Sequence, residues 1–224
     1  SEGFIRCGFV SIADEESSLH ACSTIKTRIA YHYLKQIGKL KLYSNYLHGK
    51  ICKDNFYSMI PFHLLDTVVN EEIKKNTLKK IFERIDISLK QHKRRKIDVV
   101  LGGPPCQAYS LIGRYRKGIE NDPKNTLYIL YGKFLRRYKP KVFIFENVPG
   151  ILTAGKGKIF GNLCKYFKSL GYNISAQKLN ASDFGVLQDR QRVIIVGWRK
   201  DLGKGFPILN MSETNWTSNN LLSD

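Results

Sequence analysis

A cysteine in a rigid turn is the first group in this chain that could do chemistry. Cys106 lies in the stretch 102–110, Gly-Gly-Pro-Pro-Cys-Gln-Ala-Tyr-Ser, which directly follows the apolar run 97–101. The glycines allow close approach of the backbone to a ligand, and the prolines fix the φ angles that lead to the cysteine. A thiol held in this way can act as a nucleophile when a neighbour or the substrate favours the thiolate. A buried structural cysteine is the competing interpretation, and this motif alone does not separate the two.

A carboxylate and two arginines follow the same pattern. Glu146 comes directly after a second apolar run, residues 141–145. A carboxyl group at the end of an apolar strand is partly desolvated and can share a proton near neutral pH, although a surface glutamate that caps a helix is an alternative. Arg190 and Arg192 lie in the stretch 188–192, Gln-Asp-Arg-Gln-Arg, and in an extended chain they point to one face. Arginine suits contacts with phosphate or the orientation of a carboxylate, while a solvated basic turn is the plainer interpretation.

These groups need strands and helices to position them, and the apolar pattern predicts both. A third apolar run at residues 193–197 completes a set of predicted strands. Apolar residues recur at helical spacing over residues 78–89, 127–138 and 160–170. Alternating strands and helices predict an α/β fold with a doubly wound, mostly parallel sheet, whose ligands bind beyond the carboxyl ends of the strands. We therefore expect the cysteine and the carboxylate at one edge of the sheet, and only helical pieces and loops over residues 31–75.

Composition favours a nucleic-acid partner and argues against other classes. The 224 residues suit one domain, and 37 Lys and Arg against 19 Asp and Glu give a net charge of +18. Such a surplus predicts attraction to a polyanion, without separating DNA from RNA or an enzyme from a solvated basic protein. No apolar stretch is long enough for a membrane span, and no signal peptide is recognisable, so a cytoplasmic or nuclear location is expected. Five widely spaced cysteines and scattered histidines predict neither disulfides nor a metal site.

These three motifs, together with a fourth at residues 122–127, resemble those of the cytosine-5 DNA methyltransferase family. Residues 102–110 match the nucleophile motif of the family, 146–148 match its proton-donor motif, and 188–192 match its two-arginine motif. Residues 122–127, Asp-Pro-Lys-Asn-Thr-Leu, resemble the loop and helix start on the cofactor side. The order and spacing agree over residues 1 to about 200, and four motifs in register are far more specific than any one of them.

The resemblance implies a Rossmann-like fold that uses S-adenosylmethionine, with an antiparallel strand near Val193–Gly197. It implies double-stranded DNA as substrate, with the target cytosine flipped out of the duplex. Cys106 would add to C6 of the base while Glu146 hydrogen-bonds or protonates N3, so that C5 accepts the methyl group and then loses its proton. The residues implied are Cys106, Glu146, Arg190 and Arg192 for catalysis, Gln107, Ser110, Arg114 and Asn147 for substrate, and Glu16, Gly103, Pro105 and Leu127 for cofactor.

The resemblance leaves the cofactor contacts partly open. An acidic residue that ends a strand predicted from near Phe9 would accept the ribose hydroxyls, and Glu16 takes this position with Glu15 as the rival. Ser17 stands where the family usually has an apolar residue against adenine. A second acid is expected soon after a glycine, where this chain offers Lys50.

The expected organisation is one catalytic and cofactor-binding domain over residues 1–200. Residues 201–224 would start the connection to a target-recognition region that this chain does not contain. A longer parent protein, a partner chain that supplies target recognition, or a degraded remnant all fit. The alternative functions are a tRNA cytosine-5 methyltransferase and a catalytically silent, basic DNA-binding fragment. A cysteine hydrolase is disfavoured because no histidine lies in a matching motif.

Overall fold

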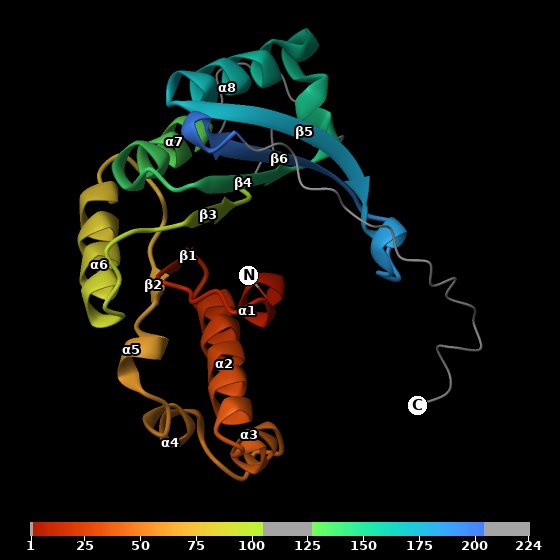
Figure 1. Ribbon diagram of the computed structural model, residues 1–224. Helices are drawn as coiled ribbons and strands as arrows, with labels where there is room; N and C mark the ends of the chain where they lie inside the picture. The colour runs from red at the N-terminus through yellow and green to blue at the C-terminus, as the bar shows by residue number, and fades with distance from the viewer. Residues whose placement is uncertain (1, 105–126, 204–224) are drawn as a thin grey trace. The chain divides into compact units, whose positions relative to one another are not determined.

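The computed structural model describes residues 2–104 and 127–203. The chain divides into two compact units, the first ending at Lys96 and the second beginning at the next residue. Each unit combines helices with strands, which confirms the predicted α/β class (Figure 1). The assignment of residues 1–200 to one catalytic domain stays a prediction. Of residues 201–224, the structure describes only the first three.

The second unit is built on a sheet whose four strands are, in order, β3 (Val99–Gly102), β4 (Val142–Asn147), β6 (Gln191–Arg199) and β5 (Tyr172–Asn180). β3 and β4 run parallel, with Val99 opposite Val142. β6 runs antiparallel to both of its neighbours, so three of the four strands point the same way (Figure 1). The mostly parallel sheet and its antiparallel strand around residues 193–197 are therefore confirmed.

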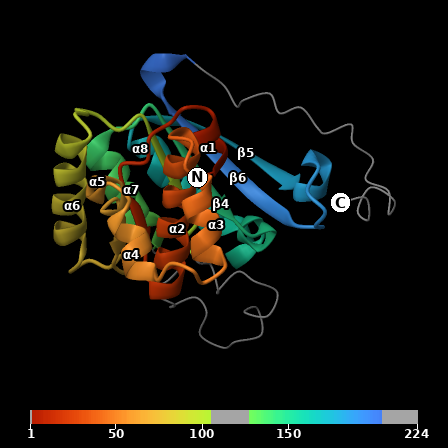
Figure 2. The same ribbon diagram turned by 90° about the horizontal axis from the view of Figure 1, so that it is seen from below.

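Two helices, α7 (Leu127–Tyr138) and α8 (Lys158–Ser169), cover one face of this sheet (Figure 1 and Figure 2). Phe143 and Phe145 alternate with partly exposed residues along β4, and both are buried in this helical layer. Tyr131 of α7 meets both rings edge-on. Its hydroxyl donates to the carbonyls of Val100 and Ile144, each at 3.1 Å. Aromatic packing thus fixes α7 against β3 and β4, and both helices match the segments where helical spacing predicts them.

Short 3-10 helices make the connections of the second unit. The loop after β4 enters α8 through Gly157, whose φ of 82° is readily adopted by glycine. This glycine is also the residue before the first turn of α8, where it offers no side chain to cap the helix. The 3-10 helices are η5 (Pro149–Leu152), η6 (Ala154–Gly157), η7 (Ala181–Phe184) and η8 (Lys200–Leu202).

The first unit holds a two-stranded parallel sheet of β1 (Asp14–Glu16) and β2 (Val68–Asn70). The sequence predicts that the first strand starts near Phe9, and this start is wrong because β1 begins at Asp14. Only residues 14–16 have a backbone partner in β2, whereas Phe9 lies in a segment that turns after Gly8 and is 45% exposed. Extended chain becomes a strand only where a neighbouring strand accepts its hydrogen bonds.

Six helices complete the first unit, and an aromatic cluster holds several of them together. The ring of Tyr46 stacks on Phe56 with centroids 4.2 Å apart, and Ala30 and Leu34 are buried in the same cluster. The helical pieces predicted over residues 31–75 are confirmed, but β2 was not predicted. The helices are α1 (Glu2–Arg6), α2 (Leu19–Gln36), α3 (Leu40–Leu47), α4 (Lys53–Ser58), α5 (Phe62–Leu65) and α6 (Leu78–Gln91).

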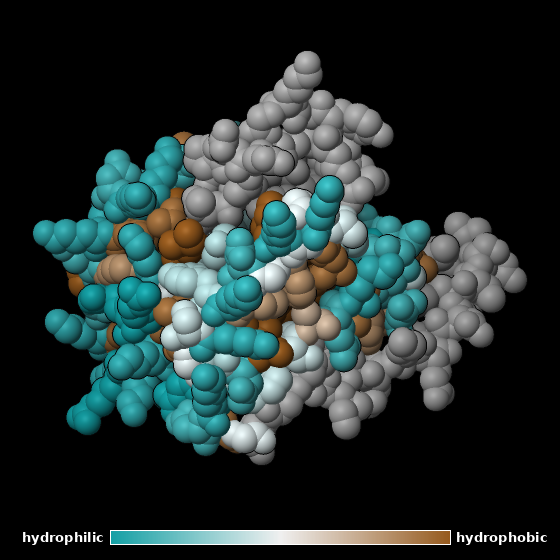
Figure 3. All heavy atoms as spheres, turned by 90° about the horizontal axis from the view of Figure 1, so that it is seen from above, coloured by the Kyte–Doolittle hydropathy of each residue, from teal (hydrophilic) through white to brown (hydrophobic). Residues whose placement is uncertain are grey.

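Hydrophilic side chains dominate the face shown in Figure 3. Figure 3 shows long hydrophilic side chains over much of the face it presents, with smaller hydrophobic areas between them. Among the described residues, no helix is both long and apolar enough to cross a bilayer. The same residues contain no group of three or more His, Cys, Asp or Glu side chains suited to hold a metal ion.

Candidate functional site

An ion pair stands at the carboxyl end of β4. Glu146 lies opposite Ile194 of β6, and Arg192 lies two residues earlier on the same face of that strand. The Nε of Arg192 is 2.6 Å from Oε1 of Glu146. The carboxylate side chain is 38% exposed and the arginine side chain 24%, so the pair is accessible to a ligand. The pairing orients Glu146 because the guanidinium holds one oxygen and leaves the other available.

Gly103 lies directly against this carboxylate. It follows β3, whose carboxyl end is beside that of β4 because the two strands are parallel. A Cβ atom added to Gly103 would stand 2.7 Å from Oε2 of Glu146, closer than real Cβ contacts allow. The glycine-rich turn and the glutamate therefore meet at one edge of the sheet, as the strand pattern predicts. Cys106 itself lies outside the described residues, as do Pro105, Gln107, Ser110 and Arg114.

For the methyl transfer that the motif resemblance implies, we expect Gly103→Ala to lower the rate by about 10- to 100-fold, because the added methyl group displaces the Glu146 carboxylate from its place beside Arg192. Steady-state methyl transfer measures the loss, and thermal unfolding monitors the fold. Gly161→Ala is the matched control, because a Cβ atom at that helical position meets nothing within 4 Å. Equal activity of Gly103→Ala and the control would show that the contact with Glu146 is unimportant.

Two other predicted site residues, Asn147 and Arg190, make different contacts from those of Glu146 and Arg192. Asn147 is only 4% exposed, and its Oδ1 accepts a hydrogen bond from the amide of Val148 at 2.8 Å. Its alternation with Glu146 along β4 places it on the opposite face, toward the core. Arg190 precedes β6, and its amide donates to Oδ1 of Asn180 at 2.9 Å. Of the two predicted arginines, the structure brings Arg192 to the glutamate.

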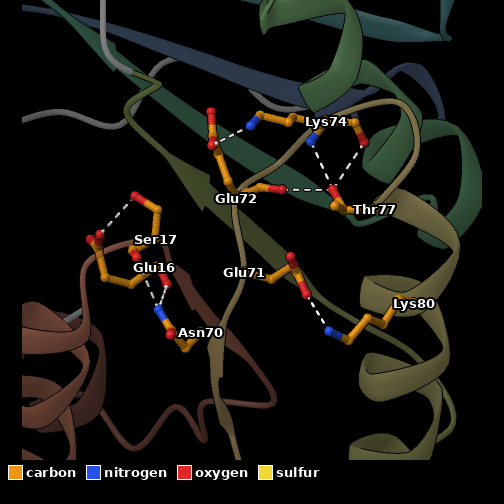
Figure 4. Close-up of polar contacts among 8 residues, drawn as sticks. All are labelled: Glu16, Ser17, Asn70, Glu71, Glu72, Lys74, Thr77 and Lys80. Carbon is orange, nitrogen blue, oxygen red and sulfur yellow. Dashed lines mark hydrogen bonds and ion pairs between the residues drawn. The ribbon is translucent and has the colours of Figure 1, made fainter.

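A second cluster of predicted residues lies in the first unit, at the carboxyl end of β1 (Figure 4). Oε1 of Glu16 accepts a hydrogen bond from the amide of Ser18 at 2.8 Å. Among the described residues Oε2 of Glu16 has no hydrogen-bond partner. Asn70 at the end of β2 donates from Nδ2 to the carbonyls of Glu16 and Ser17, at 2.9 and 3.0 Å. Asn70 therefore fixes the backbone that presents the Glu16 carboxylate.

Asn70 was not predicted from the sequence. The signal was present, because Val68 and Val69 form a short apolar run followed by polar residues, as in the other strands. Gly49, the residue before Lys50, lies in the turn that follows helix α3 and has a φ of 70°. The two acids after β2 are both paired in Figure 4, Glu71 with Lys80 and Glu72 with Lys74.

Glu15 points to the opposite face of β1 from Glu16 and is half-buried, with Oε1 of its carboxyl group shielded from solvent. Burial raises the pKa of its carboxyl group from 4.5 to about 7, and Oε1 has no hydrogen-bond partner in the described structure. Burial also raises the pKa of Asp14, even though Ser11 donates a hydrogen bond to it at 2.7 Å. The fold thus disfavours the ionised form of Glu15 relative to an ordinary carboxyl group, which argues against a role as the ligand for ribose hydroxyls.

The raised pKa of Glu15 predicts that stability falls as pH rises. The folded state holds a proton that the unfolded chain releases near pH 4.5, so the stabilising contribution is complete below that pH and is lost as pH rises through about 7. We expect unfolding free energy to drop by up to about 3 kcal/mol over this range. Glu15→Gln should flatten the profile, whereas exposed Glu83→Gln should not. Denaturant unfolding from pH 5 to 8 measures this, and an unchanged slope in Glu15→Gln would contradict it.

Comparison with known proteins gives the family. Residues 64–223 match the model of the C-5 cytosine-specific DNA methylase family, and the chain belongs to this family. It is 34% identical to the type II methyltransferase M.Bpa9945I of Bacillus paralicheniformis, over 97% of this chain and 55% of that protein. It is 39% identical to the type II methyltransferase M1.HphI of Haemophilus parahaemolyticus, over 58% of this chain and 35% of that protein.

The chain therefore spans about half, or less, of the length of these curated relatives. Among solved structures, it is similar to a DNA modification methyltransferase encoded within an E. coli prophage. That match has a TM-score of 0.46 and 26% identity, and it covers 62% of this chain and 36% of the other.

Proposed function

We propose that this protein transfers a methyl group from S-adenosylmethionine to C5 of cytosine in double-stranded DNA. The observation that carries the proposal is the Glu146–Arg192 pair at the carboxyl end of β4, with Gly103 of the cysteine-bearing turn against it. Membership of the C-5 cytosine-specific DNA methylase family supports the same reaction. The net charge of +18 suits a polyanionic substrate.

In this proposal the residues of the chain divide the work on the base. The Cys106 thiolate forms a bond to C6, and the electron pair of the C5–C6 double bond moves into the ring toward N3. Protonated Glu146 donates to N3 and gives up its proton as negative charge develops there, and Arg192 then holds the resulting carboxylate in place. C5 takes the methyl group as its bond to the cofactor sulfur breaks, and S-adenosylhomocysteine leaves. Loss of the C5 proton to solvent restores the double bond and expels the Cys106 thiolate, and N3 returns its proton to Glu146. The further proposed substrate contacts are Arg190, Gln107, Ser110 and Arg114. Asn147, which the resemblance also implied, is buried on the opposite face of β4 and fits a structural role instead.

The end of β1 fits the ribose of the proposed cofactor. Within the part of the chain that the structure describes, Oε2 of Glu16 has no hydrogen-bond partner, and a ribose diol offers two hydroxyl donors to such a carboxylate. The burial of Glu15 supports Glu16 as the ribose ligand. S-adenosylmethionine, when bound, supplies a methyl group made electrophilic by the positively charged sulfur. Gly103, Pro105 and Leu127, the first residue of α7, are the other proposed cofactor contacts.

We expect Asn70→Ala to weaken S-adenosylmethionine binding by about tenfold, because two hydrogen bonds that fix the Glu16 backbone are lost. Calorimetry measures the cofactor Kd directly. The matched control is Asn55→Ala on the exposed side of α4, which should bind the cofactor as the unmodified chain does. A cofactor affinity that Asn70→Ala leaves unchanged would contradict the proposed role of the β1 end.

The decisive assay follows labelled methyl groups from S-adenosylmethionine into duplex DNA and, separately, into tRNA. Incorporation into DNA supports the proposal, and incorporation into tRNA alone would replace it with the tRNA methyltransferase. Cofactor binding without transfer to either would favour a silent DNA-binding fragment. A partner chain that supplies target recognition is part of the proposal, and adding the corresponding segment of a longer relative tests it. A cytoplasmic or nuclear location, where DNA is present, is proposed on the same grounds.

A further inference from the structure

A basic cavity lies at the other end of the sheet in the second unit. Its volume is about 540 Å³, within the range of ligand sites. It is lined by the end of α7, the turn before β5, and the segment where β6 passes into η8. At this end of the sheet β5 begins and antiparallel β6 ends, beside the amino end of β4. At the rise of a β-strand, about 15 Å of β4 separates this end from Glu146.

Four cations line this basic cavity, namely Arg136, Lys139, Arg199 and Lys200. The one acid in its lining, Asp201, is already paired with Arg199, at 2.7 and 3.0 Å. No carboxylate of the described chain pairs with the other three cations. Like charges gathered in one concavity repel each other, so a negatively charged ligand would stabilise the cluster.

Hydrogen bonds to main-chain carbonyl groups hold the cationic segments in place. Nη1 of Arg199 donates to the carbonyl of Lys139 at 3.3 Å, and the amide of Lys200 donates to the carbonyl of Gly171 at 3.1 Å. Lys139 has a φ of 45°, which is unfavourable for a residue with a Cβ and more so before Pro140.

We propose that the basic cavity binds backbone phosphates of DNA, at a surface separate from the edge that carries Glu146. Arg136, Lys139 and Lys200 are all exposed and can reach phosphates outside the cavity wall. The positive surface continues to Lys168, next to Ser169 of the lining. The described part of the second unit has 14 Lys and Arg against five Asp and Glu. An extended basic surface suits a polyanion better than a single small anion, and such contacts carry affinity without reading sequence.

The test measures how the affinity of the full chain for a duplex depends on salt. Each lost phosphate contact lowers the log–log salt slope by about one, so we expect Arg136→Gln/Lys139→Gln/Lys200→Gln to lower it by about two to three. The matched control, Lys75→Gln/Lys79→Gln/Lys90→Gln, removes the same charge from exposed positions on and before α6 and should leave the slope nearly unchanged. Circular dichroism confirms that both triple variants are folded.

Three outcomes would overturn the proposal. An equal change of slope in both triple variants would mean that overall charge, not this cavity, is responsible. An unchanged DNA slope, with loss of inorganic phosphate or mononucleotide binding in the cavity variant, would make the cavity a site for small anions. If the unmodified chain showed no salt-dependent binding to DNA, DNA would not be the ligand of the basic cavity. Because the measurement needs no methyl transfer, it can succeed or fail independently of the proposed catalytic function.

Discussion

Cys106→Ala is expected to lower methyl transfer to cytosine on the order of 10⁴-fold or more, because without the thiolate no bond forms at C6 and C5 stays a poor nucleophile. Binding to duplex DNA should be nearly unchanged, since the thiol adds only one neutral or singly charged group to a surface dominated by cations. Single-turnover transfer of labelled methyl groups and a separate binding titration measure the two effects.

Cys52→Ala is the matched control for this variant. Cys52 is exposed in the structure, so removing its thiol should leave both transfer and binding intact. Transfer by Cys106→Ala at the rate of Cys52→Ala would exclude the covalent mechanism. Loss of both transfer and DNA binding in Cys106→Ala, with a lowered Tm, would instead indicate a structural cysteine.

The second large effect is expected for Glu146→Gln. The amide keeps the size of the side chain but cannot share a proton with N3 as a carboxyl group does, so we expect kcat to fall by about 10²- to 10⁴-fold. The ion pair with Arg192 is lost as well, which weakens the orientation of the side chain. Cofactor affinity should not change, because the proposed ribose ligand, Glu16, belongs to a different strand.

Asp98→Asn provides the comparison for Glu146→Gln. Asp98 also makes an ion pair, with Lys141 at 2.8 Å, but it stands before β3, at the end of the strands opposite to Glu146. Its removal tests whether any loss of an ion pair in this sheet lowers activity. A kcat for Glu146→Gln equal to that of Asp98→Asn would rule out a role for Glu146 in the reaction.

Much of the second unit was predictable because its apolar residues follow simple periods. The apolar runs that became β3, β4 and the centre of β6 are rich in β-branched and aromatic residues, as most strands are. Only β4 and β6 bury side chains fully, whereas β3 stays partly exposed. The helices α7 and α8 each bury one stripe of side chains on the sheet, and this requirement produces helical spacing in the sequence. In the first unit, α6 was predicted on the same grounds.

The strands that were missed carry only a short or weak apolar signal. β5 reads Tyr-Asn-Ile-Ser-Ala-Gln-Lys-Leu-Asn and lies at the edge of its sheet, so most of its side chains need not be apolar. β2 has only three residues, of which Val68 and Val69 are buried. A run this short is a strand only because β1 pairs with it, and that pairing joins residues more than fifty positions apart in the chain.

The sequence by itself determined which reactive groups the chain carries and where they stand relative to the strands, because side-chain chemistry and hydrophobic period are local properties. It left two choices open that the tertiary structure decided. Pairing between β4 and β6 sets the face and register that bring Arg192, rather than Arg190, to Glu146. Pairing between β1 and β2 partly buries Glu15 and leaves Glu16 at the open end, held by Asn70. Register shifts reverse the direction of every side chain in a strand, and register is fixed only by partners distant in sequence.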